Sequence, residues 1–462
     1  MEKIVDHSAR VAVIGLGYVG LPLAVGFARA GYPVLGLDVD PAKVASLSQG
    51  RSYIQDVAST DVAAVTDSGR LRASSDYRLL REMNVIFICV PTPFDARKAP
   101  DLSYIEQAAQ GIAAHLQPGQ LVILQSTTYP GTTEEFVLPL LEKSGLKAGQ
   151  DFCLAFSPER INPGDQKHTV ENTPKVVGGL TPRCTELARV LLAQLFAHVH
   201  VVSSPRAAEM TKLLENIFRS VNIALVNELA LLSERMGIDL WEVIEAAKTK
   251  PFGFMPFYPG PGVGGHCIPV DPYYLSWKAR EYDFYTKFIE LAAEVNLAMP
   301  YHVVDVVSQA LSREGKVLAG SRVLILGVAF KRDVDDARNS PAERIIELLL
   351  RRGAEVSYSD PYVPRYHVGD DVFCPEERWL EHVELSDEVL AAADCAVIVA
   401  GHRVVDYGRL LQRTSLVVDT DNSTSGLDGT ARVVRIGAPA APAPLHPTQD
   451  GVAGDARQMQ RK

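Results

Sequence analysis

Cys267 follows the glycine-rich part of the segment PGPGVGGHCIPVDP, which spans residues 259–272. Glycine backbone lets a substrate approach main-chain amides closely, and a helix that begins just after the thiol favours its thiolate form. Asp271 is predicted to be the N-cap of that helix and Pro272 its first residue, with the helix continuing to Arg280. The segment therefore predicts a nucleophilic cysteine. The alternative is a tight turn around a small buried thiol.

A second chemical pattern lies near the amino end. An apolar strand at residues 11–14 runs into Gly15, Gly17 and Gly20, a helix follows, and the next strand ends at Asp38. In this pattern Gly15 makes the turn, Gly17 admits a pyrophosphate and Gly20 allows close helix packing. The acid binds the ribose hydroxyls. Asp38 would repel a 2′-phosphate, so NAD is predicted rather than NADP. The alternative for Asp38 is a turn residue at a strand end.

A long helix is predicted over residues 205–236, and one of its faces is polar. Glu209, Lys212, Asn216 and Ser220 recur at helical spacing and form a narrow stripe. The apolar residues of the helix predict that most of it is enclosed, so that the stripe lies in a cleft; the alternative is an ordinary solvated face. The residues assigned to apolar faces are Met210, Leu213, Leu214, Ile217, Phe218, Val221 and Leu225.

The remaining pattern alternates strand and helix up to about residue 203. Predicted strands at 85–90, 121–125 and 152–156 run into short polar segments, where a doubly wound sheet places ligand contacts. A second βαβ unit begins with a strand at 322–330, and its only fingerprint glycine is Gly327, so a second dinucleotide site is not expected.

Basic residues precede the next predicted helix start. The segment KRDVDDARNSP at 331–341 carries Lys331 and Arg338, with Ser340 as a cap and Pro341 as the first helical residue. This arrangement suits a phosphate. The alternative is a surface loop of mixed charge. From Ile436 onward Ala and Pro dominate, and a disordered tail is predicted.

Composition narrows the class of protein. A chain of 462 residues is too long for one core, and its net charge of -10 argues against nucleic acid as a partner. Six widely spaced cysteines, with no CxxC, indicate neither disulfides nor a metal site and fit a reducing cytoplasm. Neither a signal peptide nor a membrane-spanning stretch is expected.

Taken in order, these motifs resemble the nucleotide-diphospho-sugar 6-dehydrogenases, which include the UDP-glucose and UDP-N-acetylhexosamine dehydrogenases. The resemblance covers about residues 8–435 and rests on GLGYVGLPLA, QSTTYPGTT, FSPERINPGD, EMTKLLENIFR, the Cys267 loop and AFKRDVDDARNSP. It implies an α/β chain with two Rossmann-like doubly wound domains joined by a long central helix and a helical dimerisation region. The implied division is 1–204 for NAD, 205–315 for the central helices and the cysteine loop, 316–437 for the UDP-sugar, and a disordered tail at 438–462.

The resemblance also implies roles for individual residues. Cys267 would carry the C6 carbon through a thiohemiacetal and a thioester during a four-electron oxidation that reduces two NAD molecules. The implied catalytic set is Cys267, Lys212, Asn216, Asp271, Glu159 and Thr127. The implied NAD-binding set is Gly15, Gly17, Tyr18, Val19, Gly20, Asp38, Pro91, Thr92, Ser126 and Thr127. The implied substrate-binding set is Arg160, Lys212, Asn216, Phe257, Tyr258, Gly262, Gly264, Gly265, Lys331 and Arg338, with Arg338 reaching over from a second subunit as in relatives.

Rival roles stay open for three of these residues. Glu159 could be a loop acid paired with its neighbour Arg160, Asp271 only a cap, and Thr127 only a turn hydroxyl. His266 invites a Cys-His pair, but no acid to orient it is identifiable and adjacent residues point apart, so a structural or substrate-contact role is predicted.

Substrate choice within the family depends on departures from its patterns. Val270 and Gln125 stand where UDP-glucose dehydrogenases carry lysine, so the chain resembles the UDP-N-acetylhexosamine branch. UDP-N-acetylglucosamine is the first expectation, with the N-acetylmannosamine and N-acetylgalactosamine sugars and UDP-glucose as alternatives. A homodimer or higher homo-oligomer supplying surface polysaccharide precursors is implied. Outside the class, the rivals are a single-hydride hydroxyacid dehydrogenase and a non-catalytic nucleotide-sugar sensor.

Overall fold

The computed structural model describes residues 1–54, 57–95, 99–160, 172–370 and 373–439. Residues 440–462 of the predicted tail at 438–462, and the INPGD part of the FSPERINPGD motif, lie outside these residues. The chain divides into two compact units, and each is composed of several segments. Unit 1 comprises Met1–Leu225, Gly262–Ala298 and Ala329–Pro341, and unit 2 comprises Val226–Pro261, Met299–Val328 and Ala342–Lys462.

Unit 1 is built on an eight-stranded sheet in the order β3-β2-β1-β4-β5-β6-β7-β8. Every neighbouring pair is parallel except β6 and β7, which are antiparallel. The strands are β1 (Val11–Ile14), β2 (Val34–Leu37), β3 (Leu71–Ser74), β4 (Val85–Ile88), β5 (Leu121–Leu124), β6 (Cys153–Phe156), β7 (Lys175–Gly179) and β8 (Val199–Val201). The order reverses between β1 and β4, and this switch point is where a doubly wound sheet binds ligands.

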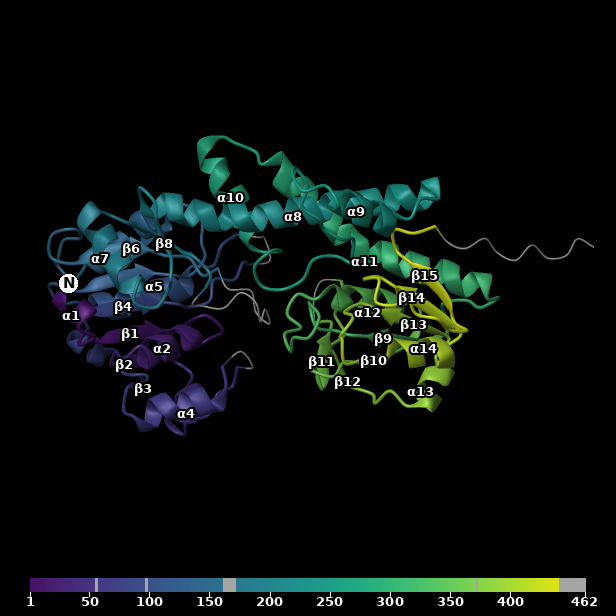
Figure 1. The fold of residues 1–462 in the computed structure, drawn as a ribbon, viewed down its shortest axis with the longest axis horizontal. Helices are drawn as coiled ribbons and strands as arrows, with labels where there is room; N and C mark the ends of the chain where they lie inside the picture. The colour runs from purple at the N-terminus through teal and green to yellow at the C-terminus, as the bar shows by residue number, and fades with distance from the viewer. Residues whose placement is uncertain (55–56, 96–98, 161–171, 371–372, 440–462) are drawn as a thin grey trace, which may run out of the picture. The chain divides into compact units, whose positions relative to one another are not determined.

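Helices cover both faces of this sheet (Figure 1). They are α1 (Glu2–Val5), α2 (Gly20–Arg29), α3 (Pro41–Ser48), α4 (Ser59–Asp67), α5 (Ser103–Ala113), α6 (Leu138–Glu142) and α7 (Pro182–Leu192), with short helical turns η1 (Tyr77–Glu82) and η2 (Thr132–Val137). Val11 and Val13 of β1 belong to one core cluster, and Ala12 and Ile14 belong to the other. Alternate residues of each strand therefore fill opposite layers.

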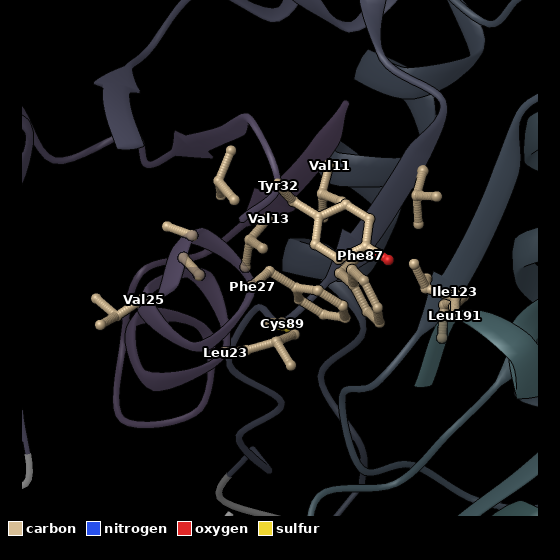
Figure 2. Packing of buried hydrophobic residues seen from close by; sticks show 14 of the residues in the cluster. Val11, Val13, Leu23, Val25, Phe27, Tyr32, Phe87, Cys89, Ile123 and Leu191 are labelled. Atoms are coloured by element: carbon tan, nitrogen blue, oxygen red, sulfur yellow. The ribbon is translucent and has the colours of Figure 1, made fainter. Parts of the chain in front are cut away.

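Figure 2 shows the first of these two layers, where Phe27 and Tyr32 pack against Phe87. The Phe27 ring meets Tyr32 edge-on, with centroids 5.6 Å apart, and lies 5.5 Å from Phe87. All three side chains are shielded from solvent. This packing joins the helix that follows the glycine turn to the centre of the sheet, and it fixes the position of that turn.

Two long helices, α8 (Pro205–Met236) and α11 (Lys287–Arg313), contribute residues to both units. The predicted bounds of α8 are confirmed. In the sequence, α9 (Leu240–Lys248), α10 (Asp271–Ala279) and the turn η3 (Arg280–Tyr282) come between α8 and α11. Within the described residues, no helix is both long and apolar enough to cross a bilayer.

Unit 2 contains a five-stranded parallel sheet in the order β10-β9-β13-β14-β15. Its elements are β9 (Arg322–Leu326), α12 (Pro341–Arg351), β10 (Glu355–Ser359), α13 (Asp387–Ala392), β13 (Cys395–Ile398), α14 (Tyr407–Arg413), β14 (Leu416–Asp419) and β15 (Arg432–Arg435), with an antiparallel pair of β11 (Arg365–Val368) and β12 (Arg378–Glu381). The fold class predicted from the sequence, two Rossmann-like domains with long helices, is confirmed.

The described chain ends in a segment that packs against the rest of unit 2. Ile436 and Ala438 are buried. The Trp241 indole donates to the Ile436 carbonyl at 2.8 Å, and the Arg435 guanidinium pairs with Asp239 at 2.8 Å. These contacts, all within unit 2, hold the segment against α9. An apolar residue that fills a site in the core orders its backbone even where the local composition is rich in Ala and Pro.

Candidate functional site

The glycine turn after β1 has the geometry that a dinucleotide requires. Gly15 has a φ of +88°, and a Cβ on it would lie 2.6 Å from the Cys89 carbonyl oxygen. A Cβ on Gly20 would lie 1.8 Å from the Gly15 carbonyl oxygen. Gly17, in contrast, has nothing within 4 Å of its Cβ position. Gly15 and Gly20 are therefore needed for the turn itself, whereas Gly17 leaves the space that a pyrophosphate needs.

Asp38 lies at the end of β2 and is bonded to the glycine turn. Its Oδ2 accepts from the Leu16 amide at 2.8 Å, and its Oδ1 accepts from the Asp40 amide at 3.0 Å. Lys43 Nζ lies 3.3 Å from Oδ2. The carboxylate thus supports the turn. Lys43 is a neighbour that the sequence interpretation did not include.

The ends of β4 and β5 are joined by hydrogen bonds. Thr92 Oγ1 donates to the Thr127 carbonyl at 2.8 Å, and Ser126 Oγ donates to the Val90 carbonyl at 2.7 Å. Pro91, Thr92, Ser126 and Thr127 therefore meet at one edge of the sheet. The Tyr274 hydroxyl of α10 donates to the Thr92 carbonyl. The helix that follows the cysteine is thereby attached to the edge where these four residues, expected from the sequence to bind the cofactor, lie.

The polar stripe of α8 is buried and meets the start of α10. Lys212 and Asn216 are 7% and 0% exposed, and Asp271 is 3% exposed. Asn216 Nδ2 donates to Asp271 Oδ2, and its Oδ1 accepts from Arg219. The Asp271 amide donates to the Cys267 carbonyl at 2.8 Å, which places the aspartate one turn beyond the thiol. Lys212, Asn216, Asp271 and Cys267 are thus brought together within unit 1.

Asp271 is not the N-cap that the sequence predicted. It is the first residue of α10, Val270 occupies the cap position, and no side chain bonds to the cap amides. The carboxylate turns instead towards Asn216. Burial raises the pKa of Asp271 to about 6, against the opposing effect of the nearby Lys212 ammonium. A carboxyl group with such a pKa can take up and release a proton near neutral pH.

The outward side of α8 differs from the prediction that most of the helix is enclosed. Leu213 is buried, but Met210, Leu214, Phe218 and Leu225 are exposed, Leu214 by 59%. The polar stripe therefore faces inward and an apolar stripe faces outward. Helical spacing separates the two stripes, but what packs against each of them is decided by the rest of the fold.

Glu209, the first residue of the polar stripe, has a structural role. Its carboxylate accepts from the Gly131 amide at 2.6 Å and from the Thr133 amide and hydroxyl at 2.9 and 2.6 Å. Burial raises its pKa. These bonds attach α8 to the start of η2, the segment that follows Thr127, and so fix the helix that carries Lys212 and Asn216.

Glu159 is paired with a residue that the sequence interpretation missed. Its Oε2 lies 2.9 Å from Lys175 Nζ and accepts from Gln125 Nε2 at 2.7 Å. The Arg160 guanidinium pairs instead with Glu215 at 2.6 Å. The suspected pairing of Glu159 with the Arg160 side chain is therefore wrong. The one feature of the sequence that could have indicated this pairing is a lysine as the first residue of the apolar strand KVVGG.

The cysteine loop packs against the 329–341 segment. The Gly265 amide donates to the Arg338 carbonyl at 3.1 Å, and Asn339 Nδ2 donates to the Gly265 carbonyl at 3.1 Å. A Cβ on Gly264 would lie 2.8 Å from the Cβ of Phe330. Glycine is therefore required for this contact. Cys267 itself is partly exposed.

His266 has an acid beside it, which the sequence interpretation did not identify. Its Nδ1 lies 3.7 Å from Asp336 Oδ2 and 3.3 Å from Arg338 Nη2. One nitrogen cannot both accept from Arg338 and donate to Asp336, so protonation of the ring selects between them. Hydrogen bonding to Asp336, and then to the Cys267 thiol, raises the pKa of His266 to about 9, which favours the protonated ring.

The expected substrate residues are found in both units. Lys331 and Arg338 belong to unit 1, where Arg338 pairs with Asp336 at 2.6 Å and lies over the Tyr18 ring at 5.2 Å. Phe257 and Tyr258 belong to unit 2. Within that unit the Tyr258 hydroxyl donates to Glu245 at 2.8 Å.

The dinucleotide turn, the sheet-edge hydroxyls, the partly exposed thiol and the buried Lys-Asn-Asp cluster are all in unit 1. Together they are the features of an NAD-dependent dehydrogenase. Comparison with known families gives the same class. Residues 9–199, 206–298 and 324–426 match the NAD binding, central and UDP binding domains of the UDP-glucose/GDP-mannose dehydrogenase family. The chain belongs to this family, whose members here include UDP-sugar 6-dehydrogenases.

Individual relatives act on several sugars. The chain is 42% identical over 356 residues to UDP-N-acetyl-D-glucosamine 6-dehydrogenase of Pseudomonas aeruginosa, covering 77% of this chain and 83% of the relative. It is 36% identical over 394 residues to UDP-N-acetyl-D-mannosamine dehydrogenase of Pyrococcus horikoshii, covering 85% and 89%. A solved structure of UDP-D-ManNAc dehydrogenase from Pyrococcus horikoshii superposes with a TM-score of 0.84 at 33% identity, covering 94% of this chain and all of the other.

Proposed function

We propose that the protein oxidises the C6 alcohol of a UDP-N-acetylhexosamine to the carboxylate, with UDP-N-acetylglucosamine as the first substrate, through a covalent adduct on Cys267. The observation that carries this proposal is that Asp271, one turn beyond Cys267, is buried together with Lys212 and Asn216 of α8. Removing four electrons from one carbon requires two hydride transfers. A thiol can retain the intermediate between them.

The proposed sequence has three steps. In the first, C6 gives up a hydride and O6 a proton, which leaves an aldehyde; NAD held at the glycine turn would be the hydride acceptor. In the second, the Cys267 sulfur bonds to C6 while the C6–O6 double bond becomes single and the thiol proton passes to O6. Loss of the O6 proton and of a second hydride, for which a second NAD would be the acceptor, leaves a thioester. In the third, a water oxygen bonds to C6, the C6–S bond breaks, and the carboxylate and the thiol are released.

The side chains of the cluster suit the charges that develop in these steps. Lys212 and the second Nδ2 hydrogen of Asn216 are donors for an oxyanion at O6. Asp271, with its pKa raised to about 6 by burial, is a proton acceptor beside them. Glu159 is assigned to the hydrolytic water, and Thr127 to the position between that water and the nicotinamide.

The proposed division of the chain follows the resemblance: residues 1–204 bind NAD, 205–315 form the central region, 316–437 bind the UDP-sugar, and 438–462 form a tail. We also propose that the protein acts in the cytoplasm and supplies precursors of surface polysaccharide. The choice of an N-acetylhexosamine is supported by the relatives named for N-acetylglucosamine and N-acetylmannosamine. Relatives named for N-acetylgalactosaminuronic acid are 35% identical.

A homodimer is the proposed assembly, and the apolar stripe of α8 supports it. Met210, Leu214, Phe218 and Leu225 are exposed, and the same helix continues with exposed Leu229, Leu232 and Met236. A contiguous apolar stripe of this kind on a helix marks a protein interface.

Substrate and mechanism are tested by one measurement, the moles of NADH formed per mole of UDP-sugar. UDP-N-acetylglucosamine, UDP-N-acetylmannosamine, UDP-N-acetylgalactosamine and UDP-glucose are compared. Two NADH per sugar are expected, with the highest kcat/KM for UDP-N-acetylglucosamine. One NADH per sugar would indicate single-hydride chemistry, and binding without NADH formation would indicate a sensor.

A further inference from the structure

A buried ammonium group lies beneath the sheet edge where Glu159 is placed. Lys175, the first residue of β7, is 1% exposed, and its Nζ lies 2.9 Å from Glu159 Oε2 and 5.0 Å from the centre of the Phe196 ring. Withdrawing a charge from water is costly, so a buried lysine is retained only beside a compensating group. Glu159 provides the opposite charge.

Gln125 holds the same carboxylate oxygen from a second strand. It follows β5, is 1% exposed, and donates from Nε2 to Glu159 Oε2 at 2.7 Å. The other oxygen, Oε1, accepts from the Arg160 amide at 2.7 Å. β5, β6 and β7 are adjacent in the sheet, so three strand ends fix one carboxylate. The Gln125 Oε1 atom is buried and has no hydrogen-bond partner among the described residues.

We propose that Lys175, with Gln125, is a positioning residue that holds the Glu159 carboxylate in the orientation needed for hydrolysis of the Cys267 thioester. The proposal rests on the proposed function. In the step concerned, the water oxygen bonds to C6, one water proton passes to Glu159, and the C6–S bond breaks. Lys175 and Gln125 hold Oε2, and Oε1, which also accepts from the Arg160 amide, is the oxygen assigned to receive the proton. Lys175 acts through Glu159 and has no contact with the reacting carbon in this scheme.

The scheme separates the two halves of the reaction. Replacing Lys175 by methionine leaves the hydride steps intact and slows the hydrolytic step, so the thioester accumulates. For Lys175→Met we expect a burst of two NADH per subunit at close to the wild-type rate, followed by steady-state turnover lowered about tenfold or more, the scale of a misplaced general base. Intact-mass measurement after acid quenching should show the acylated chain.

A rescue variant distinguishes positioning from general destabilisation. In Lys175→Met/Gln125→Lys, an ammonium approaches Glu159 Oε2 from β5 instead of β7, and the unpaired Gln125 oxygen is removed. We expect steady-state turnover to recover and the accumulated thioester to disappear. Lys278→Met is the matched control, because Lys278 is also buried, at 5% exposed, and pairs with Glu135 at 2.6 Å. It should leave the ratio of burst rate to steady-state rate unchanged.

Each outcome bears on one of the two proposals. If burst and steady-state rates fall together in Lys175→Met, or if turnover is unaffected, the positioning role is wrong. If Lys175→Met fails to fold, Lys175→Met/Gln125→Lys and Lys175→Gln are measured in its place. Lys175→Met/Gln125→Lys must then show the wild-type ratio of burst rate to steady-state rate. If Glu159→Gln accumulates thioester and the Lys175 variants do not, only the inference about Lys175 fails. If the wild-type enzyme never forms two NADH per sugar, the proposed function itself fails.

Discussion

Asn216 of α8 donates a hydrogen bond to the carboxylate of Asp271, a residue 55 positions further along the chain and the first of α10. This bond joins the polar stripe of the long helix to the helix that follows the thiol. It also leaves a carboxylate 3% exposed, close to a lysine. A buried carboxylate of this kind lowers the stability of the folded protein at neutral pH, whereas its raised pKa suits it to proton transfer during the reaction.

Asp271→Asn should stabilise the protein at neutral pH and impair it as an enzyme. An aspartate in an unfolded chain has a pKa of about 3.9, and burial raises the pKa of Asp271 to about 6. Between these values the folded chain binds more protons than the unfolded chain, so this group makes stability fall as pH rises through the window. The variant removes that loss, on the order of 3 kcal/mol at pH 7 and little at pH 4.

The measurement is urea unfolding of both proteins at pH 4 and pH 7, together with kcat. We expect kcat to fall roughly a hundredfold, as for loss of a general base. Asp283→Asn, at an exposed left-handed position that asparagine tolerates, is the control and should change neither quantity. Equal stability of wild type and Asp271→Asn at pH 7 would show that the carboxylate is not destabilised by burial.

Cys267→Ala should abolish formation of the carboxylate. Without the sulfur, C6 cannot be held as a thiohemiacetal, so at most one NADH should form per sugar and no covalent adduct should be seen by mass spectrometry. Cys374→Ala removes another partly exposed thiol, located in unit 2, and should behave as wild type. Undiminished uronate formation by Cys267→Ala would disprove the covalent route.

Asp38→Asn should shift cofactor preference towards NADP. The change removes the charge that faces the ribose and leaves Lys43, which lies 3.3 Å from Asp38 Oδ2, free to attract a 2′-phosphate. We expect KM for NAD to rise about tenfold, as for one lost hydrogen bond to a charged group, and NADP to become a measurable substrate. Adding Lys43→Gln should remove the gain with NADP. If the preference between NAD and NADP is unchanged, the only role of Asp38 is to accept the hydrogen bond from the Leu16 amide in the glycine turn.

Aspartates on the outward face of α8 should separate the proposed dimer. Leu214→Asp/Phe218→Asp places two charges on side chains that are 59% and 45% exposed in the single chain. Burying these charges in an interface would be costly. Light scattering should give half the wild-type mass. Leu427→Asp, at another exposed leucine in unit 2, should keep the wild-type mass. A wild-type mass for the double variant would place the interface elsewhere.

Features that depend on local pattern could be predicted from the residues alone. The sequence predicted the strand, turn and helix around Gly15–Gly20, because only glycine fits the φ of +88° at Gly15 and the 1.8 Å approach at Gly20. It also predicted the bounds of α8 and the start of α12 at Pro341. The family motifs are short and contiguous, so the class of protein could be inferred from them directly.

The tertiary structure decided which side chains are partners. Glu159 pairs with Lys175 instead of Arg160, His266 has Asp336 beside it, and Asp271 bonds to Asn216 instead of capping its own helix. The exposure of the apolar stripe on α8, which the sequence predicted to be enclosed, also could not be inferred from the pattern. Each of these outcomes depends on residues far apart in the sequence. Helical and strand periodicity fix which residues share a face, but only packing fixes what that face meets.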